Sequence, residues 1–169
     1  MKTIKFNWAL GALIALAAFS ASAQDSRIAY VNSQRLTVDS APAKAASAKL
    51  ETMFSKRQKE LADLQASLKS LGEKFDRDAP TMSDSQRAAK QKEFADQNRD
   101  FQRKKREFDE DFNSARNEEL QQIFDKATKA IRQLAETEKY DLVVQDAVYF
   151  NPKIDITDKV IKALNAGAK

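Results

Sequence analysis

Residues 54–75 read FSKRQKELADLQASLKSLGEKF, and the spacing of their apolar side chains decides the fold. Alternating three- and four-residue steps run along this stretch, and Arg57 is the only polar side chain at a step. The apolar positions are Phe54, Leu61, Leu64, Leu68, Leu71 and Phe75. Such spacing is the heptad pattern of a coiled coil. The stretch therefore predicts a helix that packs along a partner helix.

The partner helix follows a single break at Asp78-Ala79-Pro80. Ser83 with Gln86 three residues later predicts a capping box at its start. An apolar seam then continues through Phe94, Phe101, Phe108, Phe112, Ala115, Leu120, Ile123, Phe124, Ala127, Ile131 and Leu134. Because the break is short, the second helix should return antiparallel and form a hairpin about 50 Å long at 1.5 Å per residue. Gly72 either marks a bend in this arm or is a tolerated substitution.

Short β-rich runs lie on both sides of the hairpin. Residues 28–31 (IAYV) precede it, and residues 140–144 (YDLVV) and 147–150 (AVYF) follow it, so we expect one strand before and two after. Ser33 is the expected N-cap of a short helical turn, and Asp39-Ser40 with Pro42 marks the start of the main helix. Thr157 or Asp155 should cap a final helix. The fold class is therefore mainly α with a small β body, whose strand edges several copies would have to cover.

The first 23 residues have the pattern of a secretory signal peptide. Lys2 and Lys5 precede an apolar run, and Ala21-Ser22-Ala23 is a small-x-small cleavage site. A membrane anchor is the alternative, but the run is shorter than the roughly 20 residues that a spanning helix needs. We expect cleavage before Gln24 and a periplasmic location.

Residues 24–169 are then expected to form one domain. A hairpin arm would cover residues 43–137 with its tip near 77–84, and residues 24–42 and 138–169 would form the β body with the C-terminal helix. Removal of the two signal-peptide lysines lowers the formal charge from +4 to +2, so the position of the charge matters more than its total.

The composition argues against an enzyme. The chain has no histidine and no cysteine, which excludes Cys-His and Ser-His-Asp catalysts and the usual zinc ligand sets. Glycine is too rare for a phosphate-binding loop. We expect no catalytic residue, no cofactor and no metal.

The clearest charge bias lies on the outer half of the returning helix. Its candidate client-binding cations are Lys90, Lys92, Arg99, Arg103, Lys104, Lys105 and Arg106, with Arg87 just before them. Such a zone can attract acidic segments; the alternative is a solvated coiled-coil face whose charges pair along and across helices. Nucleic acid is a less fitting partner because of the export signal.

The candidate apolar contacts with a client are Phe75, Met82, Phe94 and Phe101. A buried seam between the two helices would equally explain the phenylalanines. Met82 is expected to be exposed at the tip.

The order of these elements resembles the Skp family, also called OmpH-like, of periplasmic chaperones for outer-membrane proteins. The specific part of the resemblance is the stretch 142–160, with Tyr149-Phe150-Asn151-Pro152 and Asp155-Ile156-Thr157-Asp158. It implies a homotrimer whose short strands form an intersubunit β barrel and whose three arms surround a cavity. The expected oligomer-body residues are Ile28, Tyr30, Leu142, Val144, Val148 and Phe150.

The function that this resemblance implies is an ATP-independent holdase for unfolded outer-membrane β-barrel proteins. Anionic membrane lipid or lipopolysaccharide is a further partner that the family suggests, with no residue of this chain assigned to it. The alternative is a structural coiled-coil protein of the cell envelope that tethers or spaces its partners without chaperone activity.

Overall fold

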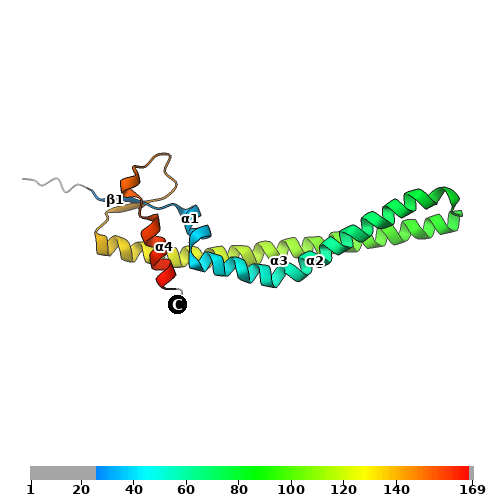
Figure 1. Ribbon diagram of the computed structural model, residues 1–169, viewed down its shortest axis with the longest axis horizontal. Coiled ribbons are helices and arrows are strands. Elements are labelled where there is room, and N and C mark those ends of the chain that lie inside the picture. The colour runs from blue at the N-terminus through cyan, green and yellow to red at the C-terminus, as the bar shows by residue number, and fades with distance from the viewer. Residues whose placement is uncertain (1–25, 168–169) are drawn as a thin grey trace, which may run out of the picture.

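The structure is a computed structural model that describes residues 26–167. Its elements in chain order are β1 (Ile28–Tyr30), α1 (Ser33–Asp39), α2 (Ala41–Asp78), the 3₁₀ turn η2 (Ala79–Thr81), α3 (Asp84–Glu138), β2 (Leu142–Val144), the 3₁₀ turn η3 (Pro152–Ile154) and α4 (Thr157–Ala166). The strands, α1 and α4 gather at one end of the molecule, and α2 and α3 extend from them as an antiparallel arm (Figure 1). The mainly α fold with a small β body is confirmed. The predicted signal peptide lies outside the described residues.

Local sequence explains where the two long helices begin and end. Ser40 caps α2 with its side chain, and Pro42 lies in the first turn, where a missing N–H costs nothing. Pro80 lies in η2 and ends α2, and the capping box of Ser83 and Gln86 starts α3. Lys139 adopts φ 55° and ends α3 in a left-handed C-cap. The predicted break and capping box are thus confirmed.

Two helix starts differ from the prediction by one residue. Asn32, not Ser33, caps α1, because its side-chain oxygen accepts a hydrogen bond from the Arg35 amide at 3.0 Å. Ile156 occupies the cap position of α4 without a side-chain bond. Asp155 nevertheless contributes there, since its carboxylate accepts hydrogen bonds from the amide and hydroxyl of Thr157.

Within residues 26–167 the β body contains one parallel pair of strands. Ile28, Ala29 and Tyr30 of β1 lie opposite Leu142, Val143 and Val144 of β2. Parallel neighbours need a crossover connection, and here the whole arm is that connection. On its other side β1 is covered near its end, where the Ile156 amide donates to the Tyr30 carbonyl at 2.9 Å.

The predicted strand at residues 147–150 is wrong. Asp146 turns the chain with φ 57°, and this segment pairs with no strand within residues 26–167. A strand needs a neighbour for its ladder of hydrogen bonds, so the segment is an extended loop. Val148 is fully exposed and Tyr149 is 84% exposed, whereas Phe150 stacks on Tyr30 with ring centroids 3.7 Å apart.

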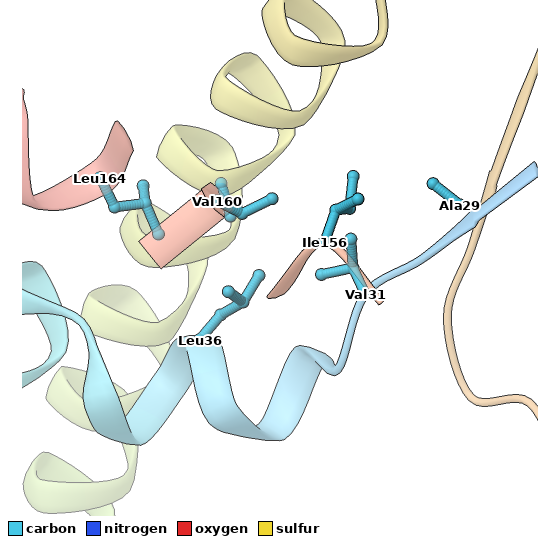
Figure 2. Packing of buried hydrophobic residues seen from close by; sticks show 7 residues of the cluster. Ala29, Val31, Leu36, Ile156, Val160 and Leu164 are labelled. Atoms are coloured by element: carbon cyan, nitrogen blue, oxygen red, sulfur yellow. The ribbon is translucent and has the colours of Figure 1, made fainter. Parts of the chain in front are cut away.

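The main core lies where the body meets the base of the arm. Figure 2 shows Val160 and Leu164 of α4 beside Leu36 of α1, with Val31 and Ile156 next to them. Leu36 and Val160 are among the largest fully buried side chains of the described chain. A second, smaller cluster joins the two arm helices through Ala43, Ala46 and Ile123. Burial therefore concentrates at the body and the arm base rather than along the whole arm.

Candidate functional site: the surface and seam of the arm

The arm is the candidate functional surface because it carries most of the predicted client-binding residues away from the main core. At 1.5 Å per residue, the 38 residues of α2 span about 57 Å. Its apolar seam is well packed near the base and thinner toward the tip. Phe54, Ile123 and Ala127 are buried in the inner half, whereas Leu68 is the only buried seam residue of α2 beyond Phe54 among the described residues.

An aromatic cluster closes the inner half of the arm. The ring of Phe54 lies edge-on to Phe108 and Phe112, with centroids 5.8 and 5.3 Å away, and those two rings stack on each other. Edge-to-face and stacked pairs of this kind add to the stability that burial provides.

Arg57, the polar residue at a seam position, is part of this cluster. Its guanidinium lies 5.8 Å from the Phe108 ring centroid and 6.0 Å from that of Phe54. It also binds Asp111 of α3 at 2.6 Å. An arginine can cover aromatic faces with its stem and cation while its charge stays paired. Arg57 therefore joins the helices, a role that heptad spacing alone did not reveal.

Gly72 faces Phe94 across the seam. A Cβ built on Gly72 would lie 3.7 Å from the Phe94 ring, which is an ordinary van der Waals distance, and α2 continues through this position. Gly72→Ala should therefore raise the free energy of unfolding by up to about 1 kcal/mol, the difference in helix propensity. Chemical denaturation at fixed protein concentration measures this. An unchanged or lower stability would show that the arm needs a bend there.

Most cations of the basic zone have partners on their own helix. Lys90 binds Glu93, Arg103 binds Asp100 and Glu107, Lys104 binds Asp100, Lys105 binds Asp109, and Arg99 approaches Asp96 at 3.7 Å. A hydrogen bond from Arg103, and secondly one from Lys104, holds the pKa of Asp100 below its usual range. The hydrogen bond that Arg103 donates to Asp100, and secondly the one that it donates to Glu107, raises the pKa of Arg103.

Two cations of the zone differ from the rest. Lys92 and Arg106 form no ion pair within the part of the chain that the structure describes. They lie two heptads apart on α3, about 21 Å along the axis at 1.5 Å per residue. The other five cations are already paired with carboxylates of their own helix. Lys92 and Arg106 are therefore the charges of the zone that are most available to a ligand.

The predicted apolar contacts are only partly available in the closed arm. Phe94 is 39% exposed. Phe75 and Phe101 are half-buried in the seam. Met82 is half-buried as well, contrary to the exposed position expected for it. Its amide donates to the Ala79 carbonyl at 3.3 Å in the tip turn, and the residue lines a surface pocket there with Thr81 and Ala89.

A groove at the base of the arm was not predicted from the sequence. It encloses about 600 Å³ between α2 and α3, and Leu50, Phe54 and Leu120 contribute to its apolar lining. Glu51, Arg116 and Glu119 also line it. The run of small side chains at residues 45–48, followed by the large Leu50 and Phe54, is the signal that could have indicated it.

The predicted oligomer-body residues divide into two sets. Tyr30 is buried, and Val144 and Phe150 are half-buried within the single chain. Ile28, Leu142 and Val148 are exposed. The body of one chain thus presents an apolar surface next to the parallel strands. Within residues 26–167 no helix is both long and apolar enough to cross a membrane.

Comparisons with known proteins agree with this architecture. A profile of the family described as Outer membrane protein (OmpH-like) matches residues 27–164. Chaperone protein Skp of Yersinia enterocolitica is 32% identical over 159 residues, which cover 92% of this chain and 97% of that protein. Chaperone protein Skp of Photorhabdus luminescens is 36% identical over 149 residues, covering 86% and 90%.

A solved structure shares the fold. The crystal structure of an OmpH-like outer membrane chaperone from Caulobacter crescentus CB15 superposes with a TM-score of 0.66 over 84% of this chain and 85% of that one, at 21% identity. The profile match and the two Skp chaperones extend over the body and the arm alike. The chain therefore belongs to the OmpH-like outer membrane protein family.

Proposed function

We propose that this protein is an ATP-independent periplasmic holdase that binds unfolded outer-membrane β-barrel precursors and keeps them soluble. The observation that carries the proposal is an arm of two helices that extends beyond the main core, on a chain that matches chaperones over nearly their whole length. A holdase needs no reaction chemistry, only many weak contacts that keep an aggregation-prone chain apart from others. Export through a cleaved signal peptide, residues 1–23, is part of the proposal.

The proposed active form is a homotrimer. In support, Ile28, Leu142, Val148 and Tyr149 are exposed beside a sheet that has two strands within residues 26–167. Two short strands are rarely stable alone, and further copies can pair with the open edge. The arms of the copies would then surround one client.

Dilution of a urea-unfolded outer-membrane β-barrel protein into buffer tests the holdase function. With the mature chain, residues 24–169, we expect light scattering from aggregation to fall and a soluble complex with the mass of three chains and one client to elute from a sizing column. An equal mass of serum albumin controls for crowding. Aggregation that continues unchanged in the presence of a folded, oligomeric chain would favour the structural coiled-coil function instead.

Electrostatic capture by the outer arm gives a second test. Lys92→Glu combined with Arg106→Glu should slow association with an acidic unfolded client on the order of tenfold at low salt, because unpaired charges steer encounter most strongly. Stopped-flow fluorescence at several ionic strengths measures the rate. The matched control is Lys129→Glu with Arg132→Glu, the same charge change at the arm base, outside the Debye length of roughly 8 Å from the zone. Equal rates for the two variants would refute a role specific to the outer arm.

A further inference from the structure

Ion pairs between the two arm helices occur only in the inner half of the arm within residues 26–167. Lys49 binds Glu119 at 2.5 Å and Arg57 binds Asp111 at 2.6 Å, and both pairs join α2 to α3. Over residues 58–107, each ion pair that the structure shows involves neighbours on the same helix. The outer halves of α2 and α3 are therefore held together mainly by their apolar seam.

That outer seam is thinly packed. Leu68 is 9% exposed, whereas Leu61, Leu64, Leu71, Phe75 and Phe101 are only half-buried. Gly72 adds no side chain opposite Phe94. At the tip, Arg87 donates to the Ala79 carbonyl at 3.2 Å, but its Nε is buried without a hydrogen-bond partner. A buried donor without a partner is costly, and opening of the tip would return it to water.

Each outer helix is also stabilised within itself. Lys59 approaches Asp63 and Lys69 approaches Glu73 in α2 at i,i+4 spacing, and Arg103 bridges Asp100 and Glu107 in α3. Pairs at this spacing stabilise a single helix whether or not it has a neighbour. Separation of the helices would thus remove the seam contacts and leave most of these pairs intact.

The closed arm offers a client little apolar surface. Its exposed large apolar side chains are Met53, Phe94 and Phe124 within the described residues, and they are scattered rather than contiguous. Most apolar side chains of the outer arm lie in the seam between α2 and α3. A holdase that contacts apolar client segments through this arm therefore needs access to the side chains of the seam.

We propose that the outer arm, residues 58–107, opens along its seam, and that the exposed stripe of leucine and phenylalanine binds apolar strand segments of the client. This inference rests on the proposed holdase function. The inner half stays closed by the Phe54 cluster and the two cross-helix ion pairs. The connection 79–83 spans about 17 Å when extended, against interaxial distances of 8–10 Å for packed helices. The opened tip can therefore admit an extended chain.

The spacing of the stripe also suits a strand. An extended client segment presents a side chain to one face about every 6.6 Å. The seam of α2 offers one roughly every 5 Å, from three- and four-residue steps at 1.5 Å each. Several successive contacts can form without an exact repeat, which fits a partner recognised by alternating apolar character rather than by one sequence.

A reversible staple across the seam tests the proposal, and the chain is suited to it because it has no cysteine. Ser70 and Asn98 lie three heptads outward from Lys49 and Glu119, at the corresponding positions of the two helices. Ser70→Cys with Asn98→Cys would be bridged by a short bismaleimide that contains a cleavable disulfide. The matched control is Lys49→Cys with Glu119→Cys bridged by the same reagent, where an ion pair already joins the helices. Ser70→Cys alone, labelled with the corresponding monomaleimide, controls for bulk.

The readout is the apparent affinity for a fluorophore-labelled outer-membrane β-barrel protein unfolded in urea. We expect the outer staple to weaken binding about tenfold or more, because affinity falls in proportion to the population of the open form. The inner staple and the single label should bind like the unmodified chain, and cleavage of the outer staple should restore binding. Equal affinity before and after cleavage of a complete outer staple would overturn the proposal. If the unmodified chain does not bind the client, the holdase function itself fails.

Hydrogen exchange of the client-free protein gives an independent arm of the test. Amides of residues 61–75 and 90–104 should exchange faster than those of residues 46–57 and 111–127, because a helix that has separated from its neighbour is only marginally stable and its backbone hydrogen bonds open more often. The outer staple should slow the first group and leave the second unchanged. Uniform protection along the whole arm would contradict an outer half that opens by itself.

Discussion

Phe54→Ala is expected to lower the free energy of unfolding by about 3–5 kcal/mol, the usual cost of removing a buried phenylalanine. The ring is 6% exposed and contacts both Phe108 and Phe112. Its loss would leave a cavity in the cluster and remove one of the two faces beneath Arg57. The inner half of the arm would then lose its main apolar contact between α2 and α3.

The measurement is urea denaturation followed by far-UV circular dichroism at fixed protein concentration, because assembly shifts apparent stability. Phe94→Ala is the matched control, since Phe94 lies in the same seam but is 39% exposed. Phe94→Ala should lower the free energy of unfolding by no more than about 1–2 kcal/mol, because Phe94 buries a smaller apolar area than Phe54 does. Equal losses in the two variants would show that the seam is packed uniformly, against the division into a firm inner and a thin outer half.

Leu36→Ala is expected to destabilise the body by about 2–5 kcal/mol. Leu36 is 2% exposed, belongs to α1 and lies in the core with Val160 and Leu164 of α4 (Figure 2). These elements come from opposite ends of the chain, so this side chain helps to hold the two ends together. Weakening it should loosen the site at which the strands meet while the arm stays helical.

Val38→Ala is the matched control for the body, because Val38 lies on the same short helix but is 61% exposed. Its effect should be within about 0.5 kcal/mol, as for most surface substitutions. The two variants are compared by urea denaturation and by their mass in solution. If Leu36→Ala left both properties unchanged, the core shown at the junction of α1, α3 and α4 would not be the main source of stability of the body.

Periodicity and helix signals within the sequence determined the arm. The three- and four-residue steps of the seam, Pro80 at the break and the capping box of Ser83 with Gln86 are local features, because each acts through residues within a turn or two. Local patterns predict helices well for this reason. In the sequence, apolar residues also stand closer together toward Leu134, at the end of the arm where the structure buries Ile123 and Ala127.

Features that depend on residues far apart in the chain could be seen only in the tertiary structure. A β-rich run becomes a strand when another strand pairs with it, so 142–144 pairs with β1 whereas 147–150 remains a loop. The role of Arg57 depends on Phe108 and Asp111, 51 and 54 positions later in the chain, which bring a polar side chain into the seam. Pairing within α3 decided which cations of the basic zone remain available. Local spacing specified the helices, and contacts across the hairpin specified how firmly they hold together.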